Sequence, residues 1–154
     1  MEINELISSK DIIVNLKSTS KKQALQALAR HAEIVFEENS RMIFDVLMER
    51  EKLGTTGVGN GIAIPHGKLS RIKKPHGIFA RLENPVDFQA IDNQPVDLIF
   101  VLFAPTAAGA DHLKALARIS RLLRDKSICE KLRGTETVDG LYAILTESSG
   151  SEAS

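Results

Sequence analysis

Residues 96–104 read VDLIFVLFA, and Asp97 is the only polar residue in this run. A strand with one face in water alternates polar and apolar residues, whereas a strand covered on both faces is apolar almost throughout. The run therefore predicts a central strand of a sheet, with helices packed against both of its faces. As a helix, the run would be too short to cross a bilayer.

Two more strands are predicted upstream of this central strand. Residues 11–16 (DIIVNL) and 77–81 (GIFAR) are short segments rich in branched or aromatic residues, which favours strands. Asn84-Pro85 and residues 92–95 (DNQP) are typical of turns and are expected to bound the strands.

Helices are expected between the strands because apolar residues recur at helical spacing. Ser20 and Gln23 form a capping-box pattern that starts a helix over residues 21–37. A second helix is expected to follow a cap at Asn39 and Ser40 and to close at Lys52-Leu53-Gly54. A third is expected to be capped by Asp111 and to end before Asp125. A short helix over residues 127–132 and a last one from Val138 are expected after it.

Strands and helices interleave without an internal repeat, so the pattern predicts one α/β domain, a mixed β-sheet flanked by helices on both faces. The domain is expected to cover residues 1–147. Residues 148–154 (SSGSEAS) are small or polar and are predicted to form a flexible C-terminal tail. The one cysteine, Cys129, is interpreted as a small packing residue.

The composition argues against several classes of partner. Twenty acidic residues balance twenty basic ones, and the chain has one Tyr and no Trp, so neither charge nor base stacking favours nucleic acid. The N-terminal residues MEINELISSK lack the apolar stretch of a signal peptide, and no segment predicts membrane insertion. The protein is therefore expected in the cytoplasm, without a metal or other cofactor.

Residues 54–67 (GTTGVGNGIAIPHG) fail the familiar nucleotide-binding patterns. A P-loop needs a glycine five residues before its Gly-Lys pair, and Ile62 stands there; Leu69 also replaces the metal-binding Ser or Thr. The dinucleotide fingerprint fails because the glycines lie at every second position and precede a strand. The chain contains no paired Cys ligands.

What the stretch does predict is an exposed histidine. Residues 62–64 read as a short strand that stops at Pro65 and presents His66 at its end, with Gly67 behind it. A loop with many glycines can point N–H groups inward and form a concavity that suits an anion. The expected support for a phosphate is Thr55, Thr56, Gly57, Gly59, Gly61 and Gly67.

A neutral imidazole with an unperturbed pKa of about 6.5 can attack phosphorus at cytosolic pH. His112, expected in the first turn of a helix, and Arg50, expected in the last turn of another, are candidates to stabilise phosphoryl oxygens. On residues alone, the alternative that His66 is a structural turn residue stays open. His31 and His76 are interpreted as surface or packing residues.

The segment EREKLGTTGVGNGIAIPHGKL, residues 49–69, resembles the active-site segment of the mannitol/fructose type of phosphotransferase-system enzyme IIA, and it is most similar to the nitrogen-regulatory branch. The resemblance covers residues 5–147 and includes VDLIFVLFAP and DHLKALARISRLL. It implies a mixed sheet flanked by helices. It also implies that His66 accepts a phosphoryl group from a phosphohistidine on an HPr-like carrier, with His112 and Arg50 stabilising the phosphate.

The resemblance makes a phosphorylatable regulator the first hypothesis, with targets such as potassium-transport or sensor-kinase proteins. Two alternatives stay open at this point. One is a sugar-specific enzyme IIA that passes its phosphate to a IIB component of a fructose or mannitol transporter. The other is a non-catalytic interaction module built on the same scaffold.

Overall fold

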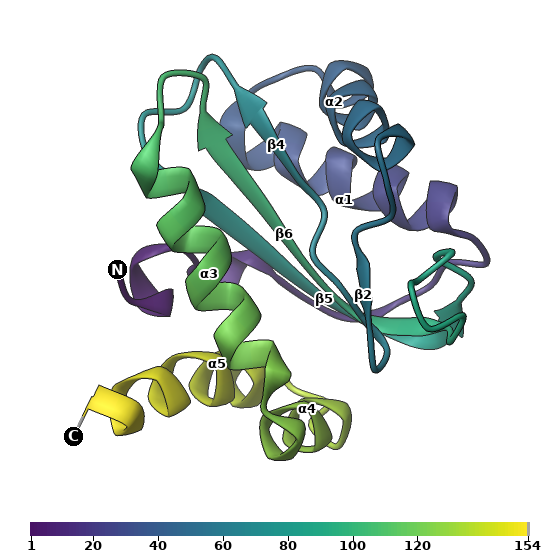
Figure 1. Cartoon of the computed structure of the whole chain (residues 1–154), viewed down its shortest axis with the longest axis vertical. Helices are drawn as coiled ribbons and strands as arrows, with labels where there is room; N and C mark the ends of the chain where they lie inside the picture. Colours follow the sequence, from purple (N-terminus) through teal and green to yellow (C-terminus); the bar gives the residue numbers. More distant parts are fainter. Residues whose placement is uncertain (154) are drawn as a thin grey trace.

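The computed structural model describes the backbone of residues 1–153 and the side chains of residues 1–147. The described residues form a mixed sheet with two helices on one face and three on the other (Figure 1). The strands are β1 (Ile12–Leu16), β2 (Gly57–Gly59), β3 (Ile62–Ala63), β4 (His66–Leu69), β5 (His76–Val86) and β6 (Val96–Pro105). The predicted α/β class is confirmed.

The strand β6 lies at the centre of the sheet, as its apolar run predicted. The strand order is β1-β5-β6-β3-β2, and β4 pairs with β6 beyond the end of β3. The β5 strand is antiparallel to β6, whereas β3 and β4 are parallel to it. Every residue from Leu98 to Ala104 is fully buried.

The two faces of β6 enter separate hydrophobic clusters because successive side chains of a strand point to opposite sides. Leu98, Phe100 and Leu102 belong to one cluster, and Ile99, Val101 and Phe103 belong to the other. The second cluster is closed by α1 (Lys21–Phe36) and α2 (Ser40–Lys52). The first is closed by α3 (Ala110–Arg124), α4 (Lys126–Arg133), α5 (Val138–Ala153) and the turn η1 (Ile3–Glu5). A second turn, η2 (Ser9–Asp11), leads into β1.

Three local predictions need correction. Asn84 and Pro85 lie inside β5, where the register with β6 shifts between Arg81 and Val86, so an irregular stretch of strand replaces the expected turn. Asp111 does not cap α3, because Gly109 holds the N-cap position and makes no side-chain bond there. The helix at 127–132 begins one residue earlier, where the Asp125 side chain accepts hydrogen bonds from Ser127 N and Ile128 N.

The segment predicted as a flexible tail, residues 148–154, lies within the last turns of α5 as far as Ala153. Residue 154 is outside the described residues. The flexibility of this segment stays a prediction.

Candidate functional site

His66 is the first residue of β4 and lies beside the central strand. The β3 strand ends at Ala63, and the chain rejoins β6 at His66, which pairs with Leu102. Pro65 has no N–H to donate, but its carbonyl accepts a hydrogen bond from Leu102 N at 2.9 Å. The imidazole therefore stands at the start of a second strand, which corrects its predicted place at the end of the first.

Two hydrogen bonds define the tautomer of His66. Its Nδ1 lies 3.0 Å from the carbonyl oxygen of Ile64, which can only accept, so we assign the ring proton to Nδ1. Its Nε2 lies 3.2 Å from Nε of Arg50, which can only donate. Both contacts place the free lone pair on Nε2. Burial lowers the pKa of His66 below its usual value, which favours the neutral form.

Arg50 reaches His66 from the last turn of α2. Its Nη1 also donates to the carbonyl oxygen of Gly54 at 2.9 Å, so the guanidinium is held at two points. Gly67 allows this approach: a Cβ at that position would lie 2.4 Å from Cγ1 of Val46 in α2. The glycine behind the histidine therefore lets α2 pack close against β4.

His112 faces His66 from the first turn of α3. The two ring centroids are 5.6 Å apart, with an angle of 53° between the rings. Burial, followed by the nearby His66 and Lys68, lowers the pKa of His112. Its Nδ1 is buried and has no hydrogen-bond partner among the described residues. The structure thus brings Arg50, His66 and His112 together from α2, β4 and α3.

The glycines expected around a phosphate have packing contacts in the structure. Asn60 and Gly61, at φ 58° and 79°, form the turn between β2 and β3. A Cβ at Gly61 would lie 2.5 Å from Arg133 Nη2, and one at Gly57 would lie 2.8 Å from Ala90 Cβ. Gly59 lies against Asp92. Their role toward a phosphate stays a prediction.

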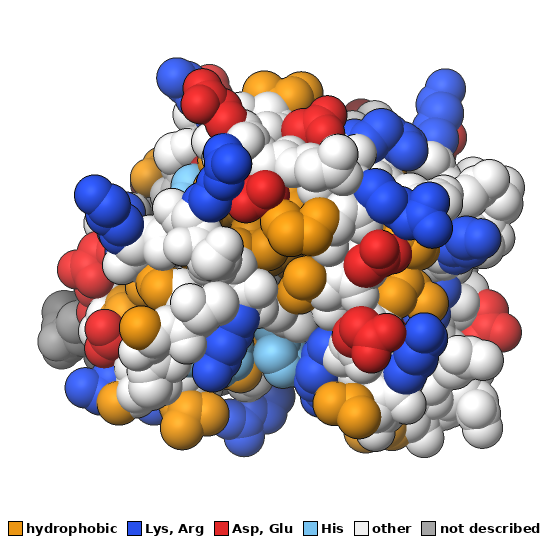
Figure 2. All heavy atoms as spheres, turned by 90° about the horizontal axis from the view of Figure 1, so that it is seen from above, with side chains coloured by type: hydrophobic (Ala, Val, Ile, Leu, Met, Phe, Trp, Pro, Cys, Tyr) orange, Lys and Arg blue, Asp and Glu red, His pale blue; other side chains and the backbone are white. Residues whose placement is uncertain are grey.

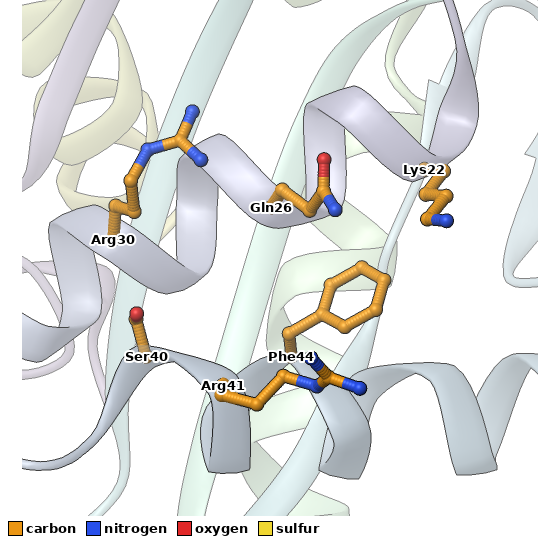
Figure 3. A pocket seen from close by; sticks show the side chains of 6 residues that line it. All are labelled: Lys22, Gln26, Arg30, Ser40, Arg41 and Phe44. Atoms are coloured by element: carbon orange, nitrogen blue, oxygen red, sulfur yellow. The ribbon is translucent and has the colours of Figure 1, made fainter.

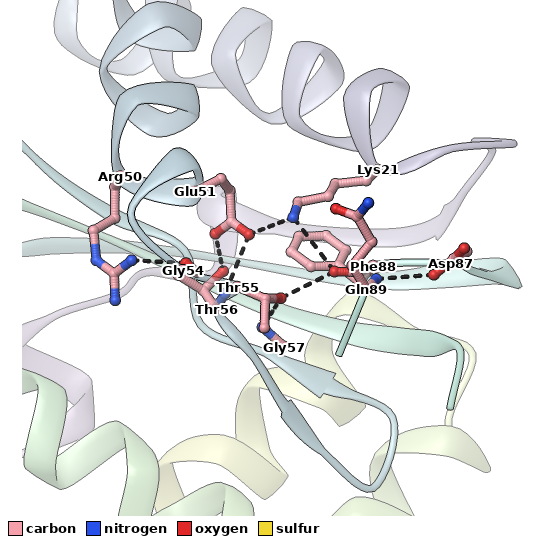
Figure 4. A network of polar contacts seen from close by, with 10 residues as sticks. All are labelled: Lys21, Arg50, Glu51, Gly54, Thr55, Thr56, Gly57, Asp87, Phe88 and Gln89. Carbon is pink, nitrogen blue, oxygen red and sulfur yellow. Dashed lines mark hydrogen bonds and ion pairs between the residues drawn. The ribbon is translucent and has the colours of Figure 1, made fainter. Parts of the chain in front are cut away.

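Thr55 and Thr56 donate their hydroxyl hydrogens to protein groups. Thr55 Oγ1 donates to the carbonyl of Phe88 at 3.0 Å, and Thr56 Oγ1 donates to the Glu51 carboxylate (Figure 4). A phosphate would have to compete with these bonds, so their predicted support of a phosphate also stays a prediction. Sequence reasoning missed Glu51; the available signal was an acid next to Arg50 at a helix end, followed by two threonines.

His31 and His76 both lie beside the buried carboxylate of Asp11. His76 Nε2 lies 2.9 Å from Asp11 Oδ2, and His31 Nε2 lies 3.9 Å from Oδ1. Burial would raise the pKa of Asp11, but the two imidazoles outweigh it and hold that pKa well below its usual range. These contacts fit the predicted packing role of both histidines.

A hollow of about 320 Å³ lies between α1 and α2 (Figure 3). Its lining residues are Lys22, Gln26, Arg30, Ser40, Arg41 and Phe44, which include no His, Asp or Glu. A space-filling view from above shows a histidine side chain in a notch of the surface, with Lys or Arg side chains on either side (Figure 2). In contrast to the hollow between α1 and α2, the cluster of Arg50, His66 and His112 combines a nucleophile with a cation.

Within the described part of the chain, no group of three or more His, Cys, Asp or Glu side chains could hold a metal ion. The described helices include none that is long and apolar enough to cross a membrane.

Comparisons with known proteins identify relatives along nearly the whole chain. Residues 5–148 match the family model described as "Phosphoenolpyruvate-dependent sugar phosphotransferase system, EIIA 2". A nitrogen regulatory protein of Bradyrhizobium diazoefficiens is 55% identical over 145 residues, which cover 94% of this chain and 95% of that protein. One of Escherichia coli (strain K12) is 43% identical over 132 residues, covering 85% and 81%. The crystal structure of nitrogen regulatory protein IIA-Ntr from Neisseria meningitidis matches with a TM-score of 0.88 at 36% identity, covering 94% and 99%.

Proposed function

Because the chain belongs to the EIIA 2 family of the phosphoenolpyruvate-dependent sugar phosphotransferase system, we propose that it is a histidine phosphocarrier with a regulatory role. It accepts a phosphoryl group on Nε2 of His66 from an HPr-like carrier protein, and the group comes ultimately from phosphoenolpyruvate. The observation that carries this proposal is the pair of hydrogen bonds that leaves the lone pair of His66 on Nε2, facing Arg50.

The transfer exchanges one P–N bond for another. The Nε2 lone pair of His66 attacks phosphorus, and the bond between phosphorus and the donor imidazole breaks, with its electron pair left on the donor nitrogen. The His66 ring gains positive charge as it shares its lone pair. The Nδ1–H bond to the Ile64 carbonyl stabilises that charge and holds the ring in its reactive orientation.

Arg50 and His112 act on the phosphoryl oxygens. Arg50 loses its acceptor when Nε2 bonds to phosphorus, so its Nε–H turns to a phosphoryl oxygen while Nη1 stays on Gly54. His112 supplies a ring N–H, and the first turn of α3 adds its free backbone N–H groups. This chemistry consists of positioning and charge stabilisation, so the chain's own residues suffice for it.

The regulatory part of the proposal rests on exposed apolar side chains near the site and on the relatives named nitrogen regulatory protein. Leu53 is 85% exposed one residue before Gly54, and Leu113 is 66% exposed next to His112. A phosphate on His66 adds nearly two negative charges beside them, which weakens docking of an apolar partner surface. The targets proposed are proteins of potassium transport or sensor kinases.

The test is phosphorylation by enzyme I, HPr-like carrier and phosphoenolpyruvate. We expect acid-labile, base-stable incorporation that His66→Ala abolishes and His112→Ala slows. Stoichiometric incorporation into the His66→Ala variant would refute the assignment. The family description names a sugar system, so phosphorylated protein is also incubated with candidate IIB domains. Rapid loss of phosphate to one of them would establish the sugar-transport alternative in place of regulation.

A further inference from the structure

We propose that the buried carboxylate of Glu51 is a positioning residue that fixes the loop after α2 and, through it, the guanidinium of Arg50 against His66. Only the kinetic test of this inference depends on the proposed phosphocarrier function. Figure 4 shows the arrangement: Arg50 and Glu51 leave the end of α2 in different directions, and the loop through Gly54, Thr55 and Thr56 passes between them.

The position of Arg50 depends on this loop. Among the described residues, the Arg50 side chain makes two hydrogen bonds. One is to the imidazole to be phosphorylated, which changes during the reaction. The other is the carbonyl of Gly54, which does not. Gly54 has φ +153° and lies just after the C-cap of α2, Leu53, where no regular backbone pairing fixes its carbonyl. A side-chain contact to the loop must therefore hold the carbonyl of Gly54 in place.

Glu51 supplies that hold. Its side chain is 2% exposed, and its carboxylate accepts the backbone N–H of Thr56 at 3.1 Å and the Thr56 hydroxyl. The backbone N–H of Gly54 itself donates to the carbonyl of Glu51 at 3.1 Å. Glu51 thus binds the loop at both ends, with the carbonyl that anchors Arg50 between the two attachments.

Lys21 holds the carboxylate from the other side. Its Nζ lies 2.7 Å from Glu51 Oε1 and 4.9 Å from the centre of the Phe88 ring, and it also donates to the Phe88 carbonyl at 3.4 Å. Thr55 donates to the same carbonyl. The start of α1, the end of α2 and the loop at Phe88 therefore meet at one ion pair, whose carboxylate is buried and whose ammonium is partly exposed.

A stabilising role alone does not account for this pair. Desolvating two charges costs about as much as their attraction returns, so packed apolar residues would stabilise the fold as well. Buried carboxylate bonds are directional, however, and they fix one loop conformation where apolar packing would allow several. Fixing the loop matters here because the Arg50 guanidinium must keep its position and orientation while its hydrogen bond to His66 Nε2 is replaced by one to the phosphate.

The test compares Glu51→Gln with Glu49→Gln, which changes an exposed glutamate on the same helix that forms an ion pair with Lys52. We expect Glu51→Gln to slow phosphoryl transfer from the HPr-like carrier about tenfold, through kcat more than KM. Glu49→Gln should leave the rate within twofold. In an Arg50→Ala background, Glu51→Gln should slow transfer by less than twofold, because it acts through Arg50. Equal slowing in both backgrounds would overturn the inference.

A second readout needs no phosphorylation. We expect the ¹⁵N NMR signal of His66 Nε2 in Glu51→Gln to move toward its position in Arg50→Ala, because both changes weaken the Arg50 hydrogen bond. An unmoved signal would refute the positioning role. Thr56→Val, which keeps the shape of Thr56 and removes its hydroxyl, should move the signal in the same direction even if Glu51→Gln fails to fold. If the wild-type protein is not phosphorylated but the ¹⁵N signal of His66 Nε2 moves in these variants, the proposed function is refuted and the positioning role is retained.

Discussion

Gly67→Ala should loosen the site by separating α2 from β4. The new Cβ would lie 2.4 Å from Cγ1 of Val46, whereas carbon atoms in contact sit about 3.5–4.0 Å apart, so about 1 Å of movement is needed. Val46 cannot turn aside easily because a β-branched side chain in a helix has one strongly preferred rotamer. The helix itself must therefore move, and it carries Arg50.

The magnitude follows from two opposing effects. Overpacking of this kind costs about 1–3 kcal/mol, and the lower entropy of the unfolded chain returns about 0.4–1 kcal/mol when Gly becomes Ala. The net loss is about 1–2 kcal/mol, which for a chain of this length lowers Tm by about 2–8 °C. A shift of about 1 Å in Arg50 should slow phosphoryl transfer to His66 by tenfold or more.

Calorimetry and the transfer assay test this expectation with matched variants. Val46→Ala removes the obstructing methyl group, so Gly67→Ala combined with Val46→Ala should be more stable than the two separate losses imply, by about 1 kcal/mol. Gly134→Ala is the control, because its Cβ would meet only ordinary contacts at 3.5 Å and 3.9 Å. A Gly67→Ala variant with the Tm and transfer rate of wild type would refute the account of how α2 positions Arg50.

Three further expectations concern titration and docking. Burial lowers the pKa of His66, so its ring should stay neutral to lower pH than an exposed histidine, and an NMR titration midpoint above about 6.5 would contradict the site geometry. Asp11→Asn should destabilise the protein by about 1–3 kcal/mol at pH 7. Because the folded pKa of Asp11 is depressed, that difference in Tm should shrink as the pH falls below about 4, and a constant difference would be inconsistent with it. Leu113→Asp should raise KM for the HPr-like carrier several-fold with little change in Tm, whereas Ile34→Asp, 79% exposed on α1, should not; equal effects would exclude Leu113 from the docking surface.

The sequence predicted the central strand correctly because burial on both faces leaves a local signal. Over residues 96–104, polar and apolar residues do not alternate. It mispredicted Asn84-Pro85, where a proline near an irregular strand register resembles a turn. The cap of α3 was also wrong. Asp111 is a favourable residue in a first turn as well as at an N-cap, and only the backbone shows that Gly109 is the N-cap of α3.

Some residues of the candidate site could likewise be predicted from the sequence, and others could not. His66 stands out locally, between Pro65 and Gly67, and its neighbours made it a candidate, although on residues alone a structural turn residue stayed open. Its meeting with Arg50 and His112 depends on three elements far apart in the chain, and here the family resemblance supplied what periodicity could not. Thr56 lies only five residues after Glu51, but the ion pair of Glu51 with Lys21 joins two helices that no local pattern brings together, and Glu51 was therefore missed.

The most direct measurement of the central claim is to map the phosphate after transfer from the HPr-like carrier, by mass spectrometry for the residue and by ³¹P and ¹⁵N NMR for the ring nitrogen. The hydrogen bonds to Ile64 and Arg50 predict one phosphoryl group per chain, on Nε2 of His66. Phosphate on Nδ1 of that ring, on His31, His76 or His112, or on no histidine at all would contradict the account.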